Sequence, residues 1–165
     1  MFKKFITQER LLELFDYDNF TGHLVHKITK GRSVKGKIAG TLDKHSGYRR
    51  IGIDGLFMLA HRLVWVYHFG DEPNKILDHI NGNKEDNRIE NLRLSDFNQN
   101  QQNRRSASQN NKSGYLGVVM DRGKWKAQIQ HKGKVYHIGS YDCPKEAHQA
   151  YLDRKKTLHP FQTIA

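Results

Sequence analysis

The chain has 165 residues, and its 28 Lys and Arg against 17 Asp and Glu give a formal net charge of +11. This length allows one ordinary domain or two small ones, and the charge predicts an acidic partner, most commonly nucleic acid. The single cysteine, Cys143, excludes an internal disulfide and a cysteine-based zinc site. No apolar run approaches the roughly 18 residues of a membrane span, and residues 1–7 lack the apolar stretch of a signal peptide, so we expect no membrane contact and a cytoplasmic location.

The charge is unevenly distributed along the chain. Residues 1–77 carry a net charge of +5, residues 78–111 are neutral, and residues 112–165 carry +6. A neutral middle between two basic flanks suits a protein that contacts a polyanion at both ends. The carboxylates of the middle segment are then available for another purpose.

Local signals predict short alternating elements in the first 70 residues. Thr7 is placed to cap a helix, and Asp54-Gly55 is a strong signal for a two-residue hairpin turn. The predicted elements, in chain order, are a helix at Gln8–Phe15, a turn at Asp18–Gly22, a strand at His23–Ile28, a surface loop over Gly31–Ser46, strands at Tyr48–Ile53 and Leu56–Ala60, and a helix at His61–Phe69 that ends at Gly70.

The next segment is predicted as strand, loop, strand and helix. The expected elements are a strand at Ile76–Ile80, a polar loop at Asn83–Glu90, a strand at Asn91–Leu94, and a helix capped by Ser95 that runs to about Arg104. Asp78 and His79 stand at the end of the first strand, and Asn91 and Asn100 follow later in the motif. In such a motif the strand end and the helix face can converge on one point.

These residue types suit metal-assisted hydrolysis of a phosphodiester. The carboxylate of Asp78 and the amide oxygen of Asn100 are hard oxygen ligands of the kind that Mg²⁺ takes. A neutral His79 beside such a metal could take a proton from water near pH 7. On spacing alone, an Asp-His pair at a strand end is also compatible with a surface pair or a cap.

The full pattern resembles the HNH (His-Asn-His) endonucleases, specifically the branch found in phage and intron homing enzymes. The resemblance covers roughly residues 7–104 and rests on Asp78-His79-Ile80-Asn81-Gly82-Asn83, on Asp86-Asn87-Arg88-Ile89-Glu90-Asn91-Leu92-Arg93, on Asn100 and Asn103, on His61-Arg62-Leu63-Val64-Trp65, and on the layout from the leucine-rich helix to Ala39-Gly40-Thr41. An α+β fold with a ββα-metal motif is then expected.

The resemblance implies a role for each residue of the motif. Asp78 would bind the metal, His79 would be the general base, Asn91 would hold the loop and orient His79, and Asn100 would be the second metal ligand. Asn at position 100, where family members often have His, implies Mg²⁺ or Mn²⁺ rather than Zn²⁺. His61 is open between a buried structural histidine and a contact near the active site.

A second module is predicted after a polar linker. Between Asn98 and Asn111, nine of 14 residues are Asn or Gln, and we place a nuclease module at 1–105 (ββα-metal core about 76–104), a linker at 106–112 and a second module at 113–165. Its predicted elements are strands at Tyr115–Met120, Lys124–His131 and Lys134–Ser140, joined by turns at Asp121-Arg122-Gly123 and Lys132-Gly133, and a helix from Pro144 to about Leu158.

The middle strand of this module alternates between apolar and polar residues. Trp125, Ala127 and Ile129 would face the helix, whereas Lys and Gln would occupy the open face. Lysines can neutralise phosphates and glutamines can pair with adenine edges, so such a face could lie in the major groove of DNA. Without a nuclease beside it, a solvated basic face on a structural sheet would explain the pattern equally well.

Residues 113–161 resemble the Apetala2/ethylene-response-factor (AP2/ERF) DNA-binding domain. The resemblance rests on Ser113-Gly114-Tyr115, Gly117-Val118, Trp125-Lys126-Ala127-Gln128-Ile129, Ile138-Gly139-Ser140-Tyr141, Glu146-Ala147, Ala150-Tyr151 and Leu158-His159. The candidate DNA-binding residues of this module are Lys124, Lys126, Gln128, Gln130, Lys134, His137 and Ser140. Leu116 replaces a usual Arg, so base preference cannot be transferred. Cys143 replaces a usual Thr cap, which weakens the helix start by about 1 kcal/mol.

The sequence thus predicts a homing-type, metal-dependent DNA endonuclease, encoded by a phage or mobile element and acting on double-stranded DNA in a bacterial cytoplasm. We expect a monomer that nicks one strand and leaves 5′-phosphate and 3′-hydroxyl ends. Arg93, Arg104 and Arg105 are candidates for phosphate contacts, and a plain solvated role is equally open for each. The alternatives are a DNA-binding regulator with a silent nuclease motif and, less favoured, an RNA-binding module.

Overall fold

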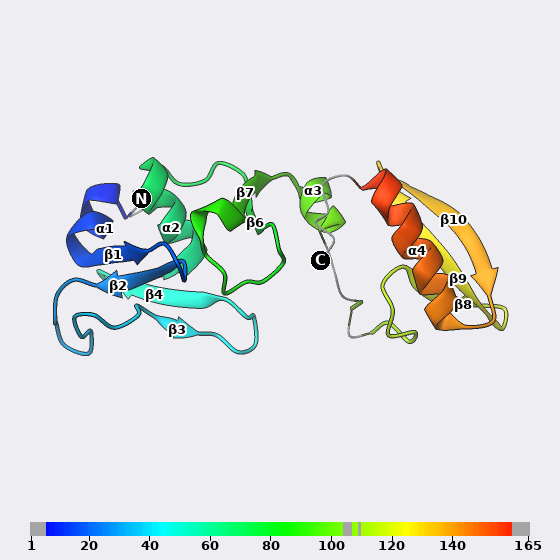
Figure 1. Cartoon of the computed structure of the whole chain (residues 1–165), viewed down its shortest axis with the longest axis horizontal. Helices are drawn as coiled ribbons and strands as arrows, with labels where there is room; N and C mark the ends of the chain where they lie inside the picture. Colours follow the sequence, from blue (N-terminus) through cyan, green and yellow to red (C-terminus); the bar gives the residue numbers. More distant parts are fainter. Residues whose placement is uncertain (1–5, 104–106, 109, 160–165) are drawn as a thin grey trace. The chain divides into compact units, whose positions relative to one another are not determined.

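The computed structural model describes residues 6–103, 107–108 and 110–159, apart from the side chains of Asn98 and Gln101. The chain divides into two compact units, Met1–Asp96 and Phe97–Ala165, which are described separately (Figure 1). Both contain helices and antiparallel strands, which confirms the predicted α+β class. In the described part of the chain, no helix has the length and apolar character needed to cross a membrane.

In its described residues, 6–96, the first unit joins two α-helices and a 3₁₀ helix to three small antiparallel sheets. Its elements are α1 (Gln8–Leu14), β1 (Phe15–Asp18), β2 (His23–His26), β3 (Thr41–Leu42), β4 (Arg49–Ile53), β5 (Leu56–Leu59), α2 (Ala60–Phe69), β6 (Ile76–His79), the 3₁₀ helix η1 (Ile89–Asn91) and β7 (Leu92–Ser95). The sheets are β1-β2, β3-β4-β5 and β6-β7.

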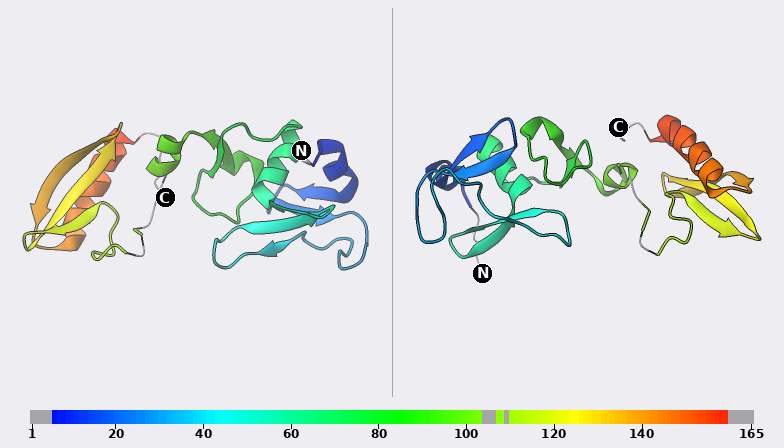
Figure 2. Two further views of the ribbon diagram at one scale, coloured as in Figure 1. Left: turned by 180° about the vertical axis from the view of Figure 1, so that it is seen from behind. Right: turned by 60° about the horizontal axis from the view of Figure 1, so that its bottom comes forward.

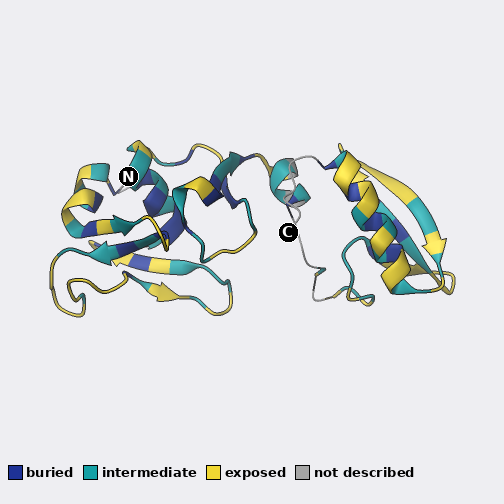
Figure 3. Ribbon diagram, viewed as in Figure 1, coloured by how far each residue is buried: buried dark blue, intermediate teal, exposed yellow. Residues whose placement is uncertain are grey.

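Helix α2 lies at the centre of this unit. Its residues Leu63, Val64 and Val66 are almost completely buried, and they belong to the same apolar cluster as Leu11 of α1 and Phe15 of β1. Figure 3 colours the ribbon by burial and shows buried stretches along α2. Burial of each such side chain contributes roughly 1.5–3 kcal/mol, so packing rather than helix propensity stabilises these short elements. The core thereby fixes α2 beside the segment that carries the candidate site.

Several local predictions for this unit are confirmed. Thr7 Oγ1 accepts a hydrogen bond from Arg10 N at 3.3 Å and caps α1. Asp54 and Gly55 both have positive φ, at 49° and 83°, which is the backbone of a type I′ turn between β4 and β5. Gly70 ends α2 in the left-handed conformation.

Other expectations for this unit are wrong. Phe15 does not continue the first helix but begins β1, which pairs with β2 over Phe15↔His26 to Asp18↔His23. The expected surface loop over Gly31–Ser46 contains the short strand β3. Asn91 closes η1 instead of opening a strand.

Ser95 does not cap a helix, as was predicted. It is the last residue of β7, completely buried, and its hydroxyl donates to the carbonyl oxygen of Ile76 across the β6-β7 pair at 3.4 Å. The hairpin therefore extends one residue further than expected, and α3 (Phe97–Gln102) begins after it. The expected helix end near Arg104 lies outside the described residues.

The second unit is a three-stranded antiparallel sheet covered by one helix. Besides α3, its elements are β8 (Val118–Asp121), β9 (Lys124–His131), β10 (Lys134–Tyr141) and α4 (Pro144–Leu158), with the strand order β10-β9-β8. Helix α4 lies along one face of this sheet (Figure 2) and packs through Ala147 and Tyr151 against Val118, Ala127 and Ile129.

The predicted alternation along β9 is confirmed. Ala127 and Ile129 are buried under α4, whereas Lys124 and Gln130 are exposed. The first strand is shorter than predicted, because Tyr115–Gly117 precedes it and Gly117 has a φ of 78°. A Cβ on Gly117 would lie 2.0 Å from the Tyr151 ring, so close packing of α4 on this turn requires glycine.

Candidate active site

The candidate site stands at the end of the β6-β7 hairpin in the first unit. Asp78 pairs with Arg93 and His79 with Leu92 across the two strands. Leu77, Asp78 and His79 are all buried, although two of them are polar. Burial of a polar side chain costs free energy unless it forms hydrogen bonds or ion pairs, so Asp78, His79 and the loop that follows them need such partners.

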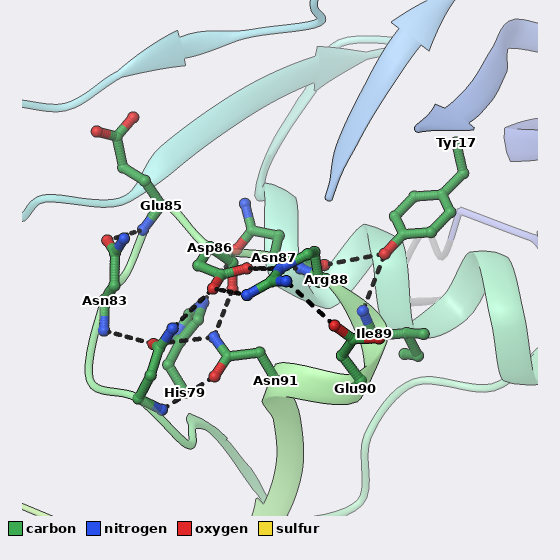
Figure 4. Close-up of polar contacts among 11 residues, drawn as sticks. Tyr17, His79, Asn83, Glu85, Asp86, Asn87, Arg88, Ile89, Glu90 and Asn91 are labelled. Atoms are coloured by element: carbon green, nitrogen blue, oxygen red, sulfur yellow. Dashed lines mark hydrogen bonds and ion pairs between the residues drawn. The ribbon is translucent and has the colours of Figure 1, made fainter. Parts of the chain in front are cut away.

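A network of amide and carboxylate side chains holds the loop between the two strands (Figure 4). Asn91 Oδ1 accepts from Asn81 N at 2.9 Å, while Asn91 Nδ2 donates to Asn81 Oδ1 at 3.0 Å and to Asp86 O at 2.7 Å. Asn81 Nδ2 also donates to Asp86 Oδ2 at 2.7 Å. Asn91 therefore ties Asn81 to Asp86 within the loop. The side chain that bonds the His79 ring is Asn87, although Asn91 was predicted to orient this histidine.

The His79 ring is held by Asn87. Its Nε2 lies 3.0 Å from Asn87 Oδ1, and both residues are buried. Since an amide oxygen only accepts hydrogen bonds, His79 donates through Nε2–H, and the lone pair of the neutral ring is on Nδ1. The Asn87 Nδ2 atom has no hydrogen-bond partner among the described residues. The side-chain amide of Asn87 therefore contacts His79 through its oxygen alone.

The environment favours the neutral form of His79. Burial lowers its pKa, and this effect outweighs the opposing influences of the Asn87 hydrogen bond and the Asp78 and Asp86 carboxylates. A neutral imidazole at physiological pH is the form that can accept a proton. Burial and a single defined tautomer are therefore compatible with a general base at this position.

His61 of α2 packs beside His79. The two rings meet edge to face with centroids 5.1 Å apart, and the Tyr48 ring lies 5.1 Å from His61 and 6.1 Å from His79. Burial above all, with smaller contributions from the neighbouring His79 and Arg62, lowers the pKa of His61 to about 3, so this ring is neutral. Of the two open interpretations, the structure therefore places His61 both in the core and against the candidate base.

Asp78 makes an ion pair that sequence reasoning did not anticipate. Arg93 donates to Asp78 Oδ2 from Nε at 3.2 Å and from Nη2 at 3.1 Å. The two side chains are 10% and 20% exposed, so the pair is largely shielded from water. Arg93 thus lies at the candidate site itself, where its positive charge is paired with the carboxylate of Asp78, the predicted metal ligand.

The oxygen donors at the site fit a hard divalent cation. No group of three or more His, Cys, Asp or Glu in the described part of the chain could by itself hold a metal ion. An ion at Asp78 would therefore draw its other ligands from amide oxygens, water and substrate phosphate, which is the habit of Mg²⁺ and not of a structural Zn²⁺. The other predicted ligand, Asn100, is part of α3 in the second unit and is half-buried.

The β1-β2 hairpin braces this loop from outside the motif. The Tyr17 hydroxyl accepts from Ile89 N at 2.9 Å and donates to Asn87 O at 3.4 Å. Gly22, with a φ of 74°, sits so close that a Cβ on it would lie 2.2 Å from Arg88 N. The backbone that carries Asn87 is thus fixed by residues about 70 positions earlier.

Most of the predicted DNA-binding residues of the second unit share one face. Cross-strand partners project from the same side of a sheet, so the pairs His137↔Gln128 and Ser140↔Lys126 join the open face of β9, on which Lys124 and Gln130 also lie. Lys134 pairs with His131 and is exposed on the other side. Arg104 and Arg105 lie outside the described residues.

Comparison with known families gives one match. Residues 58–102, from β5 through α3, match the family model described as HNH endonuclease. This segment contains all four predicted site residues: Asp78, His79, Asn91 and Asn100. The comparisons with curated proteins and with solved structures gave no match.

The chain therefore carries an HNH endonuclease domain and is an enzyme of the nuclease class. HNH nucleases generally use a divalent metal ion, and as a nuclease of this kind the protein would bind DNA. Sequence reasoning missed Asn87 and Tyr48 as neighbours of His79. Asn87 stood inside the quoted motif, but an asparagine in a polar loop gives no signal that separates a turn residue from a partner of the base.

Proposed function

We propose that the chain is a metal-dependent DNA endonuclease that nicks duplex DNA. The observation that carries the proposal is the buried His79, whose tautomer is set by Asn87 and which stands next to Asp78 inside the matched segment. A histidine presented in one tautomer beside a hard-oxygen ligand supplies the two parts that phosphodiester hydrolysis needs. The regulator with a silent nuclease motif is the alternative to be tested.

In the proposed reaction, His79 Nδ1 takes a proton from the attacking water. Asn87 keeps this nitrogen in the accepting form by occupying Nε2–H, and Asn91 keeps the loop in place. Asp78 and Asn100 would hold Mg²⁺ or Mn²⁺. When bound, such an ion polarises the scissile phosphate and stabilises the leaving 3′ oxygen. The products would be 5′-phosphate and 3′-hydroxyl ends.

Arg93 has a second role in this scheme. It shares the carboxylate of Asp78, so its guanidinium is held beside the place where substrate phosphate would bind. A planar guanidinium pairs well with both carboxylate and phosphate oxygens. We therefore assign Arg93 to orienting Asp78 and to neutralising phosphate charge.

The sheet of the second unit is the proposed module for duplex binding. Its open face carries Lys126, Gln128 and Gln130 on β9 and His137 and Ser140 on β10, which suits contacts with phosphates and base edges. The AP2/ERF likeness supports this use of the sheet. The linker at 106–112, a monomeric state and a homing role in a phage or mobile element belong to the same proposal.

One site cuts one strand in each encounter, so a monomer is expected to nick. The test is conversion of supercoiled plasmid to open circle with Mg²⁺ or Mn²⁺, with EDTA as the metal control. His79→Ala should lower the rate by roughly 10²-fold or more, because the proton acceptor is lost. His45→Ala is the matched variant, since His45 is exposed in the same unit, and its rate should stay close to the unchanged protein.

The outcomes separate the candidate functions. Nicking that requires metal and His79 supports the endonuclease. Cutting that survives in His79→Ala would show that the base is assigned wrongly or that another nuclease is present. Binding of plasmid and of a genomic fragment library with no cutting of either would favour the silent regulator. Tighter binding of duplex RNA than of duplex DNA would favour the RNA-binding module.

A further inference from the structure

The segment between β2 and β3 is held by its own backbone. His26 N donates to Lys37 O at 3.0 Å, Gly36 N donates to His26 O at 2.8 Å, and Lys30 and Ser33 exchange two backbone hydrogen bonds. An isolated bridge also pairs Val25 with Ile38. Residues 27–38, hereafter the basic arm, therefore present their side chains from a defined scaffold.

Four of the five cations of the basic arm are exposed and form no ion pair with a described carboxylate, whereas the fifth, Lys27, pairs with Asp16 at 3.4 Å. Lys30, Arg32, Lys35 and Lys37 all project into solvent. Among the described residues no carboxylate forms an ion pair with any of the four. The acidic residues nearest to these four cations in the sequence are Asp18 and Asp43, and both are engaged elsewhere. Asp18 accepts hydrogen bonds from Phe20 N and Thr21 Oγ1, and Asp43 pairs with Arg50 at 3.7 Å.

Stability does not account for this arrangement. The apolar residues of the arm, Ile28, Val34 and Ile38, are 45–48% exposed, so the arm buries little. Like charges on an ordered backbone repel each other, which opposes the fold. A polyanion that neutralises the four charges would remove this repulsion, and it would release its own counterions on binding.

The sheet of the second unit presents a weaker charge. There Lys124 pairs with Asp142 at 3.0 Å and Lys126 lies 3.8 Å from Asp121. Two of the lysines expected to contact DNA are thus already opposed by carboxylates. By charge alone, the basic arm is the stronger contact for phosphate.

The basic arm is also linked to the loop that carries the candidate site. It leads into β3 and then into the β3-β4 turn (Figure 1). From that turn, Ser46 O accepts a hydrogen bond from Lys84 Nζ at 2.8 Å, and Arg49 of β4 forms an ion pair with Glu85 at 3.6 Å. A ligand held by the arm is therefore held by the same unit as His79.

We infer that the basic arm binds the phosphate backbone of the duplex DNA substrate, as a contact of the nuclease unit that is separate from the sheet of the second unit. The inference rests on the proposed function, since it takes DNA as the substrate. It assigns Lys30, Arg32, Lys35 and Lys37 to sequence-independent binding, which positions DNA without reading its bases.

The test compares two variants of equal charge in the full chain. The arm variant carries Lys30→Gln, Arg32→Gln, Lys35→Gln and Lys37→Gln. The control variant carries Lys75→Gln, Lys145→Gln, Arg154→Gln and Lys156→Gln, which removes the same four charges from exposed positions elsewhere. Affinity for a duplex of fixed sequence is measured in EDTA over a series of salt concentrations.

Each lost phosphate contact should reduce the slope of log affinity against log salt by about 0.9. If all four cations make contacts, raising salt from about 50 to about 200 mM should weaken the unchanged protein roughly 100-fold more than the arm variant. The control variant should keep most of the original slope. Because the arm buries little, thermal unfolding should be nearly unchanged, and Arg32→Glu alone provides a milder second test.

Equal slopes for the arm and control variants would overturn the inference. If the unchanged protein still nicks plasmid in a His79-dependent manner in that case, the proposed function stands and only the arm assignment fails. Either no duplex binding by the unchanged protein or binding whose affinity does not change with salt would overturn the DNA-binding part of the proposal and the arm assignment together.

Discussion

The two units present their candidate functional residues in opposite ways. In the first unit, His79, Asn87 and Asn91 are buried, and hydrogen bonds within the motif fix their side chains. Tyr17 of the distant strand β1 also holds the backbone of the loop, at Asn87 O and Ile89 N. In the second unit, most of the candidate DNA-binding residues lie half-buried or exposed on the open face of a sheet whose other face carries the core. Chemistry requires a fixed geometry and binding requires accessibility, so the units should respond differently to mutation.

The sharpest test of this contrast is Gly22→Ala. The new Cβ would meet the Asn87–Arg88 backbone at 2.2–2.4 Å in a left-handed conformation, so we expect a loss of about 3 kcal/mol or more, together with loss of nicking. Gly55→Ala is the matched control, because Gly55 also has a positive φ but no atom lies within 4 Å of its Cβ position. It should cost about 1–2 kcal/mol and leave nicking intact.

Urea unfolding and the plasmid assay would measure both variants. If Gly22→Ala nicked as fast as Gly55→Ala, the close contact of the β1-β2 turn with the Asn87–Arg88 peptide would not matter for the site. The contrast between fixed, buried site residues in the first unit and accessible residues in the second unit would then lose its main support.

The next prediction concerns the tautomer of His79. Asn87→Ala should slow nicking roughly 10- to 100-fold, because removal of a partner that orients an active-site imidazole has effects of this size. Imidazole ¹⁵N shifts should show the Nε2–H form of His79 in the unchanged protein and a mixture of tautomers in the variant. The signal is assigned by its loss in His79→Gln, and Asn83→Ala in the same loop is the control.

This readout separates positioning from stability. A merely structural asparagine would lower the free energy of unfolding without changing the tautomer of a folded histidine. If the ¹⁵N pattern of Asn87→Ala matched that of Asn83→Ala, the proposed role of Asn87 would be wrong.

The sequence predicted the hairpins and the alternating strand but not the brace around the site. Asp54-Gly55 and Lys132-Gly133 are turn signals that act locally, and the period-two pattern of β9 reports a buried face directly. In contrast, β1 follows α1 without a helix-breaking residue, so Phe15 was assigned to the helix, Asp18 to the turn, and no strand was predicted between them. Their pairing with β2 depends on tertiary contacts that outweigh local propensity.

The candidate site was predictable only where its residues form a motif. Asp78, His79 and Asn91 were predicted as site residues because their spacing belongs to a recognisable motif, which lies in the segment that matches the HNH family. The hydrogen bond that His79 donates to Asn87 requires a fixed loop backbone. Tyr17 and Gly22, which lie far away in the sequence, contact this backbone at Asn87 and Arg88. No pattern within the loop reports a contact of that kind, so physical reasoning from sequence stops at the motif.

Acid should weaken the first unit through its buried histidines. The pKa of His61 is lowered from 6.5 to about 3, so the unfolded chain binds a proton at a higher pH than the folded one. The contribution of neutral His61 to the free energy of unfolding is fully present above pH 6.5. It falls by about 1.4 kcal/mol per pH unit below that, until the folded ring titrates near pH 3. The lowered pKa of His79 acts in the same direction.

The measurement can report on the first unit alone. The two tryptophans, Trp65 and Trp125, lie one in each core, so Trp125→Phe leaves a fluorescence signal from the first unit. In that background, His61→Phe should reduce the acid dependence of unfolding by about one proton. An unchanged dependence would mean that His61 titrates normally and is not the buried neutral ring described above.

The smallest expected effect comes from the N-terminal caps of the helices. A side chain caps α1 in the first unit, whereas no side chain caps α4 in the second unit. Thr7 accepts a hydrogen bond from Arg10 N in the first unit, whereas Cys143 precedes α4 without any side-chain cap bond. Cys143→Thr should therefore stabilise the second unit by about 1 kcal/mol, and Thr7→Ala should destabilise the first by a similar amount. Unfolding followed through Trp125 and Trp65, respectively, would measure both changes.

If Cys143→Thr gave no gain in the free energy of unfolding, Pro144 at the first helical position would already set the start of α4, and a side-chain cap would add nothing to it.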